Sequence, residues 1–241
     1  MTNISIPILM YHSIEAMPRS TVMRSLHVPP KKFNFQMKML KFLGYRGLSI
    51  RDLIPYIRGE KFGKVVGITF DDGYQNNLRY AAPILKKNNF SATCYIVSEC
   101  IGLSNIWDLN HGITQNQLMN KSEIQEWLNY GMDIGSHTKK HFDLTSISNQ
   151  KAELEINESK RELEEQFRVP VVDFCYPFGK FNNSISDIVR NAGYFSATTM
   201  IRGRAGEKSN IFQLPRIPIN HRTAHYLFLL KMLTKYEDNK Y

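Results

Sequence analysis

Two short segments of the sequence carry side chains that could hold a divalent metal ion and activate water. Thr-Phe-Asp-Asp-Gly at 69–73 places two adjacent carboxylates after the apolar run 65–68, and Ser-His-Thr-Lys-Lys-His at 136–141 places two histidines four residues apart. A catalytic metal site needs ligands from different chain segments and one open position for water. One aspartate with His137 and His141 meets that need, and the other aspartate is free to act as a base.

These segments resemble the first two motifs of the polysaccharide deacetylase family, whose members share the NodB homology domain (carbohydrate esterase family 4). A third segment, Tyr-Pro-Phe-Gly at 176–179, is a degenerate form of the family's Arg-x-Pro-Tyr-Gly, and the resemblance covers roughly residues 5–220. It implies that a divalent metal, with zinc the expected ion, is bound by three residues and that the adjacent carboxylate is the general base. The implied ligands are Asp72, His137 and His141, and the implied base is Asp71.

The family's general acid is usually a histidine in a late Leu-x-His pattern, which is absent near the C-terminal end of this sequence. Members similar to the poly-N-acetylglucosamine deacetylases instead have an early apolar-Tyr-His, as if the barrel were circularly permuted, and Met-Tyr-His at 10–12 has this form. The resemblance therefore implies that His12 is the general acid and that Met10 lines an acetyl pocket. The alternative for His12 is a capping histidine after the first strand.

The third motif departs from the family pattern because Cys175 occupies the position of an arginine that normally orients the base. We expect a remote arginine to substitute, and Arg216 is the candidate, with a surface salt bridge as the alternative. The backbone N–H of Phe178 matches the family's oxyanion donor, which needs no particular side chain. Tyr176 is expected to contact substrate, and Thr138 to support a metal ligand or contact substrate, although ordinary turn capping explains Thr138 equally well.

The rest of the sequence alternates apolar strand patterns with helical ones. Predicted strands cover 6–11, 64–70, 92–97, 132–135, 171–176, 195–199 and 215–219, and predicted helices cover 30–43, 52–58, 76–88, 122–130, 149–167, 184–191 and 223–235. Ser122 is the expected N-cap of its helix, and Leu154 and Leu163 are expected to face the core from the longest helix. The segment 102–120 has little periodicity and is predicted to be a surface loop, whose Trp107 and Asp108 line a sugar groove or simply pack.

Strand-then-helix units imply parallel strands with helical crossovers, and the motifs fall just after strand ends, where barrels of this type carry their chemistry. The family resemblance implies an α/β fold, a distorted (β/α) barrel with about seven parallel strands. The length of 241 residues favours one domain spanning 1–241.

Composition narrows the location and the partners of the protein. No run of 18 apolar residues occurs, so no transmembrane helix is expected. The first residues lack a signal-peptide pattern, which favours the cytoplasm or the cytoplasmic face of the inner membrane, with an extracytoplasmic location the alternative if a leader was trimmed.

The net charge of +9 comes from dispersed side chains without a nucleic-acid motif. We therefore expect no nucleic acid partner, and weak attraction to an anionic membrane surface is the second interpretation.

The resemblance implies hydrolysis of an N-acetyl group on an N-acetylhexosamine, in a polymer or a lipid-linked amino sugar, with release of acetate. Two alternatives remain at this point. One is an O-acetyl esterase, and the other is a catalytically weak carbohydrate-binding member, whose only support is the missing motif arginine.

Overall fold

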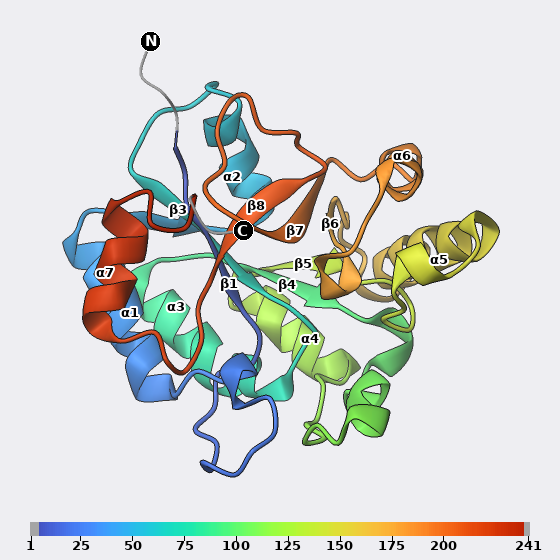
Figure 1. Cartoon of the computed structure of the whole chain (residues 1–241), viewed down its shortest axis with the longest axis horizontal. Coiled ribbons are helices and arrows are strands. Elements are labelled where there is room, and N and C mark those ends of the chain that lie inside the picture. Colours follow the sequence, from blue (N-terminus) through green and yellow to red (C-terminus); the bar gives the residue numbers. More distant parts are fainter. Residues whose placement is uncertain (1–4, 239–241) are drawn as a thin grey trace.

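The computed structural model describes residues 5–238, whose strands close into a parallel ring (Figure 1). The order around the ring is β1-β8-β7-β6-β5-β4-β3, and β3 pairs again with β1. The eighth strand, β2, pairs with β3 outside the ring. The strands are β1 Ile8–Tyr11, β2 Arg46–Leu48, β3 Val65–Phe70, β4 Thr93–Ile96, β5 Asp133–Ser136, β6 Asp173–Cys175, β7 Ser196–Arg202 and β8 Leu214–Pro218. The predicted distorted barrel of about seven parallel strands is confirmed, and β2 was not predicted.

The first strand of the sequence closes the ring. Met10 in β1 lies opposite Thr69 in β3 on one side and opposite Pro218 in β8 on the other. The strand is apolar and completely buried, as expected for a parallel strand covered on both faces. His12, which follows β1, is therefore carried to the same end of the barrel as the residues that follow β3.

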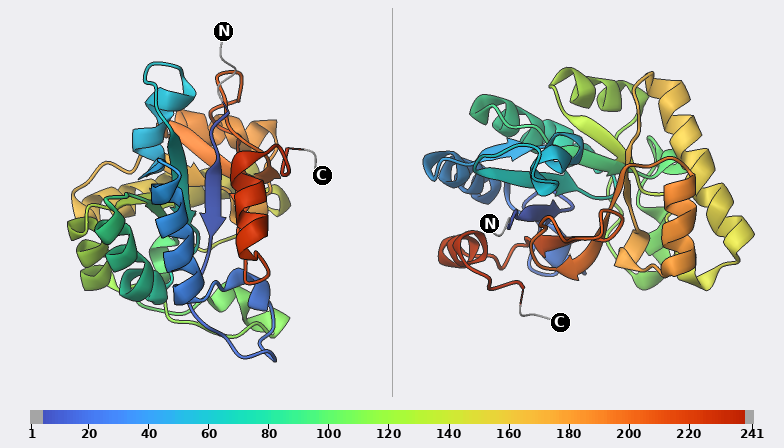
Figure 2. Two further views of the ribbon diagram at one scale, coloured as in Figure 1. Left: turned by 90° about the vertical axis from the view of Figure 1, so that its left-hand side faces the viewer. Right: turned by 90° about the horizontal axis from the view of Figure 1, so that it is seen from above.

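Helices surround the ring, as the views from the side and from above show (Figure 2). They are α1 Pro30–Phe42, α2 Ile50–Ile57, α3 Ala82–Asn88, α4 Lys121–Asn129, α5 Asn149–Phe167, α6 Asn183–Asn191 and α7 His225–Leu233. A π-helical turn, Asn77–Ala81, precedes α3, and a 3-10 helix, Ile106–His111, interrupts the long connection between β4 and α4. Among residues 5–238, none of the helices combines the length and the apolar character needed to cross a membrane.

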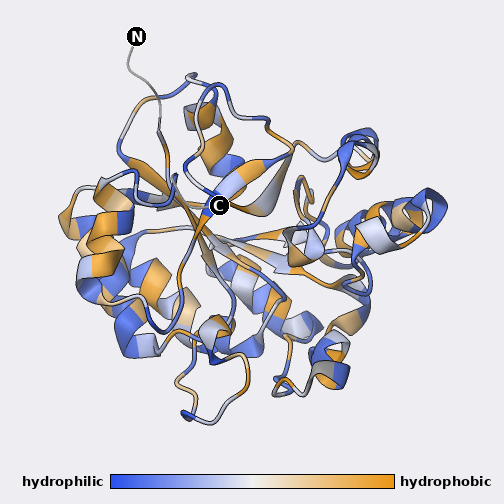
Figure 3. Cartoon of the chain, viewed as in Figure 1, coloured by the Kyte–Doolittle hydropathy of each residue, from blue (hydrophilic) through white to orange (hydrophobic). Residues whose placement is uncertain are grey.

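The longest helix, α5, buries one apolar face against the barrel. Its buried stripe runs through Ala152, Ile156, Leu163 and Phe167, at spacings of three and four residues that keep one face toward the barrel. Leu163 is buried as predicted, but the prediction for Leu154 is wrong because this residue lies two positions from Ile156, on the outer face, and is 61% exposed. In Figure 3 much of the outward surface of α5 is hydrophilic, whereas α7 is largely hydrophobic.

The start of α4 differs from the prediction. Asn120 is the N-cap, not Ser122, because the Asn120 side chain accepts the backbone N–H of Glu123 at 3.0 Å and the Glu123 carboxylate accepts the N–H of Asn120 at 2.9 Å. This reciprocal pair is a capping box. Ser122 lies in the first turn, where its hydroxyl donates to Asn120 Oδ1.

The C-terminal ends of the strands face one end of the molecule. In the left view of Figure 2, β1 points downward, and the blue connection after it gathers with the green segment before α4 at that lower end. The N-terminal end of the described chain lies at the opposite end. The residues after β1, β3, β5 and β6 therefore meet at one edge of the barrel.

Candidate active site

A cavity of about 220 Å3 lies at the C-terminal ends of the strands. His12 follows β1, Asp71 and Asp72 follow β3, and His137 follows β5, and all four side chains line the cavity. Its other lining residues are Met23, Leu26, Trp107, Asp108, Ile113, His141, Tyr176, Phe178, Gly179 and Met200. The strand ends thus bring together residues that are far apart in the sequence, at the end where α/β barrels place their chemistry.

Asp72, His137 and His141 converge inside this cavity. The Nε2 atoms of both histidines lie 3.5 Å from Asp72 Oδ1, and one donor atom from each residue lies within 4.8 Å of the others. All three residues are buried. Two imidazoles and one carboxylate are the donors of a catalytic zinc site, which keeps a position open for water or substrate. By donor type and spacing, the three residues fit a divalent metal.

The charges of Asp72 and His141 also suit a cation. Burial alone would raise the pKa of Asp72, but the hydrogen bond with His137 and the charges of the surrounding histidines hold it well below its usual range, so the carboxylate is ionised. Burial, followed by the charge of His137, lowers the pKa of His141 to about 3. A neutral imidazole and a carboxylate are the forms that bind metal. For His137, burial lowers the pKa, but Cys175 and the hydrogen bond with Asp72 raise it well above its usual value, so a metal would have to displace a proton from this imidazole.

Neighbouring groups hold both imidazoles in place. His137 Nδ1 lies 2.7 Å from the backbone oxygen of Cys175, so this nitrogen donates and the ring is oriented with Nε2 toward Asp72. Trp107 stacks on the His141 ring at 4.4 Å between centroids, and the edge of Phe178 contacts the same ring at 4.6 Å. Trp107 thus packs on a site residue and also lines the cavity, and its role in a sugar groove stays a prediction.

The segment that carries the two histidines is not helical. Thr138 and His141 have φ values of 67° and 60°, in the left-handed region that is costly for residues with a Cβ. The buried Glu155 on α5 accepts the backbone N–H groups of Lys139 and Lys140, at 3.1 and 2.9 Å, through a single oxygen, Oε2. This clamp holds the unusual turn between the ligands. No local motif pointed to Glu155, because it lies in an amphipathic helix where glutamate is common.

Arg216 forms a two-pronged ion pair with Asp71. Its Nη1 and Nη2 atoms lie 2.7 and 2.8 Å from Asp71 Oδ1 and Oδ2, and its Nε donates to the backbone oxygen of Thr199 at 2.8 Å. The arginine is 1% exposed, so the surface salt bridge considered from the sequence is excluded. Burial would raise the pKa of Asp71, but the Arg216 charge and hydrogen bonds lower it below its usual value.

Cys175 contributes to this ion pair from the position of the missing motif arginine. Arg216 Nη2 lies 3.3 Å from Cys175 Sγ. In this protein the guanidinium that contacts Asp71 comes from β8. An arginine at the motif position would instead come from the end of β6.

His12 lies on the other side of Asp71. Its Nε2 is 3.9 Å from Asp71 Oδ2, and its side chain is 17% exposed at the cavity wall. Asn77, at the start of the π-helical turn, donates its Nδ2 hydrogen to the backbone oxygen of His12 at 2.7 Å and accepts the N–H of Ile14 at 3.1 Å. These contacts fix the chain just after β1. Asn77 was not predicted, because its role depends on a strand that precedes it by more than sixty residues.

The turn after β6 presents Phe178 to the cavity. Phe178 has φ 57°, a strained value for an aromatic residue, and is 45% exposed. Gly179 follows with φ 66°, and a Cβ there would lie 2.8 Å from the backbone nitrogen of Met200. Tyr176 is 1% exposed, and its hydroxyl donates to the backbone oxygen of Phe212 at 3.0 Å, while part of the residue lines the cavity.

Two predicted substrate residues do not line the cavity. Met10 is buried in β1, and Thr138 is fully buried with its hydroxyl accepting the backbone N–H of His141 at 2.9 Å. The structure therefore places Thr138 in the turn-capping position that the sequence left open as its alternative.

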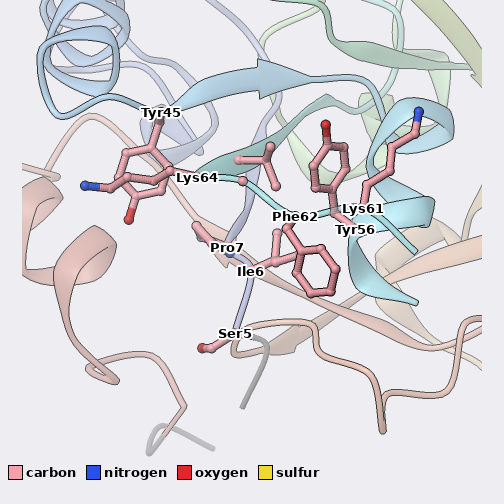
Figure 4. Close-up of a pocket in the computed structure, with 10 residues that line it drawn as sticks. Ser5, Ile6, Pro7, Tyr45, Tyr56, Lys61, Phe62 and Lys64 are labelled. Carbon is pink, nitrogen blue, oxygen red and sulfur yellow. The ribbon is translucent and has the colours of Figure 1, made fainter. Parts of the chain in front are cut away.

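A separate cavity of about 210 Å3 lies at the opposite end of the barrel (Figure 4). It is lined by residues before β1 and β3 together with Tyr45, Tyr56, Lys61 and Phe62. Its lining contains no histidine, carboxylate or cysteine. The chemistry described above is confined to the other end.

Comparisons with known proteins agree with this geometry. Residues 58–197 match the family model for polysaccharide deacetylase. A Bacillus subtilis protein named as a polysaccharide deacetylase, YxkH, is 31% identical over 217 residues, which are 89% of this chain and 71% of that protein. The poly-beta-1,6-N-acetyl-D-glucosamine N-deacetylase of Staphylococcus aureus is 26% identical over 221 residues, covering 86% of this chain and 73% of that one.

A solved structure is also similar along almost the whole chain. The Streptococcus pyogenes deacetylase PplD, in complex with acetate, superposes with a TM-score of 0.83 and 28% identity, covering 97% of this chain and 100% of that chain. The similarity extends beyond the matched family model to the first and last strands of the barrel, β1, which His12 follows, and β8, which contains Arg216.

Proposed function

This chain belongs to the polysaccharide deacetylase family, and from that premise we propose that it is a metal-dependent hydrolase that removes N-acetyl groups from an amino sugar. The substrate class we propose is an N-acetylhexosamine, in a glycan or a lipid-linked amino sugar, and the products are acetate and the free amine. One observation carries the proposal: Asp71, held by Arg216, lines the same cavity as Asp72, His137 and His141. The name of the Staphylococcus aureus relative supports the N-acetyl linkage.

The metal set would be Asp72, His137 and His141, with zinc the expected ion. When bound there, a divalent ion polarises the acetyl carbonyl and acidifies water. The remaining chemistry falls to side chains that surround this position.

Asp71 takes a proton from the attacking water. Its carboxylate is ionised because the buried guanidinium of Arg216 contacts both oxygens, and this contact leaves it ready to accept. As the water oxygen bonds to the acetyl carbon, negative charge develops on the carbonyl oxygen, and the Phe178 backbone N–H is the protein donor that we propose for it.

His12 acts on the leaving group, whereas Asp71 acts on the attacking water. Protonated at Nε2, it donates to the amide nitrogen as the C–N bond breaks, so the amine leaves in its neutral form. Water supplies the new oxygen of acetate. His12 is near enough to Asp71 to belong to the same site, at 3.9 Å, and yet is exposed to the cavity where the leaving amine would lie.

Acetate release from N-acetylglucosamine oligomers tests this function. We expect release by the zinc-restored protein, none by the metal-stripped protein, and almost none by Asp71→Asn. An O-acetyl esterase would instead cleave aryl acetates and leave the amides intact. A carbohydrate-binding member would bind the oligomers and release no acetate from either kind of substrate, and both results would contradict the proposal.

A further inference from the structure

A second cavity continues from the catalytic one. It has a volume of about 610 Å3 and shares Trp107, His141 and Phe178 with the catalytic cavity. The catalytic cavity, at about 220 Å3, is smaller than the roughly 300–1,000 Å3 of typical ligand sites. A substrate larger than one sugar must therefore extend beyond it, and the shared residues make this second cavity, here called the outer lobe, its continuation.

The floor of the outer lobe is apolar. It is formed by Cys100, Leu103, Ile106, Trp107, Phe142 and Phe178. Leu103 and Ile106, on the connection between β4 and α4, are 49% and 52% exposed. Contiguous exposed apolar surface beside a reactive site indicates a bound apolar group.

The carboxylates and the lysine that line the outer lobe each have an ion-pair partner. Lys140 Nζ lies 3.2 Å from Glu99 Oε2, and Asp143 Oδ2 lies 2.6 Å from Lys180 Nζ. A sugar ring would need several convergent donors and acceptors for its hydroxyls. The charged groups here already pair, and the aliphatic floor offers none.

We propose that the outer lobe binds a hydrocarbon chain, so that the substrate is an amphiphile in which an N-acetylated amino sugar carries an alkyl or isoprenoid group. The proposal rests on the proposed function, because it assigns the acetylated sugar to the catalytic cavity. The chain passes over Trp107 and Phe178 and lies against Leu103 and Ile106. The next sugar of a polymer is the competing occupant.

Kinetics with alkyl glycosides of N-acetylglucosamine distinguish the two occupants. We expect kcat/KM for acetate release to rise from methyl to butyl to octyl glycoside, by up to about fourfold for each CH2 that becomes buried (~0.8 kcal/mol). A farnesyl glycoside compared with a straight chain of equal length separates isoprenoid from alkyl preference. A rise with oligosaccharide length, and none with alkyl length, would overturn the proposal.

Variants connect this dependence to the outer lobe. Leu103→Ser and Ile106→Ser are expected to reduce the octyl-to-methyl ratio of kcat/KM several-fold. Leu109→Ser is the matched control, because Leu109 lies on the same 3-10 helix as Ile106 and is 62% exposed, but does not line the outer lobe. An octyl-to-methyl ratio of kcat/KM that is the same in wild type and in all three variants would contradict the assignment.

A binding measurement separates failure of this proposal from failure of the proposed function. Octyl glucoside has no acetyl group, and of the two tryptophans only Trp107 lines the outer lobe, since Trp127 is fully buried. Below its micellar concentration, octyl glucoside is expected to change tryptophan fluorescence with saturation, and the change should disappear in Trp107→Phe. Saturable binding without any deacetylation would remove the function and keep the apolar site, whereas deacetylation without binding or chain-length dependence would do the reverse.

Discussion

The two terminal nitrogens of Arg216 each donate to a different carboxylate oxygen of Asp71, across 145 positions of sequence. The pair is buried and is anchored further by Thr199 and Cys175. Buried charge pairs of this kind hold a geometry that neither residue would keep alone. The position and the ionisation of the proposed base thus depend on a residue from the last strand of the barrel.

Replacing Arg216 should impair the base more than the metal set. Arg216→Lys keeps the charge and loses the two-pronged contact, so we expect kcat to fall by roughly 10- to 100-fold. Because Arg216 lowers the pKa of Asp71, the weaker contact should raise that pKa and move the acidic limb of the rate profile to higher pH. The pH dependence of kcat/KM measures this shift, and zinc binding by calorimetry should stay near wild type. An unshifted acidic limb with normal folding would contradict the role, and the exposed Arg222 provides the control, Arg222→Lys.

Replacing His12 should affect amides and activated esters differently. A general acid is needed to expel an amine, whereas a nitrophenolate leaves without protonation. We expect His12→Gln to lose about 100-fold or more in acetate release from N-acetylglucosamine oligomers, and much less with nitrophenyl acetate. Equal losses on both substrates would show that His12 does not protonate the leaving group.

Glu155 should set the affinity for metal without touching it. Its carboxylate accepts the two N–H groups between the histidines, and Glu155→Gln replaces the charged acceptor with a weaker one. Groups that orient ligands typically change metal affinity by about 10- to 100-fold, and we expect the lower end of that range by competition with a zinc chelator dye. The control is Glu153→Gln on the exposed face of the same helix. A lower melting temperature with unchanged zinc affinity would reduce Glu155 to a structural role.

Asp173, in β6, should make the free energy of unfolding depend on pH. Burial raises its pKa to about 7, against the smaller opposing effect of its hydrogen bond from Ser196. The folded state then keeps a proton that the unfolded chain releases near pH 4, so this carboxyl group contributes its full stabilising free energy below that pH. The contribution is lost as the pH rises through about 7. Its full size is roughly 4 kcal/mol, because the folded and unfolded pKa values differ by about three units.

Asp173→Asn removes this titration. Urea unfolding at pH 5 and pH 8 should show that the variant gains stability relative to wild type at the higher pH. The exposed Asp187 gives the matched control, Asp187→Asn, which should show no such trend. A difference between variant and wild type that is constant with pH would refute the assignment.

The sequence predicted the site well where the chemistry is local. The Asp pair and the two histidines belong to short motifs, and each follows an apolar strand whose pattern can be read directly. It also pointed to Arg216, although only the fold shows that β8 brings this arginine against Asp71. Glu155 and Asn77 were missed because each supports a site residue by contacting the backbone of a remote segment, and such contacts leave no mark on local composition.

The errors in the fold have similar causes. Leu154 is apolar but lies on the outer face of α5, and a broad helical pattern did not separate it from the buried stripe. Ser122 is a favourable cap by type, yet Asn120 together with Glu123 completes a capping box two residues earlier. The three-residue strand β2 contains Gly47 and lies outside the ring, and is too short for an alternating pattern.

Closure of the ring through β1 has a consequence for synthesis of the protein. β1 can pair with β3 once both have been synthesised, but its other edge has no partner until β8, nearly the whole chain later, is also made. Long-range parallel pairing of this kind is slow, and an open strand edge invites pairing with other chains. We therefore expect the nascent chain to expose a strand edge through most of translation. The proposed base also lacks its ion-pair partner until then, because β8, the strand that covers this edge, carries Arg216.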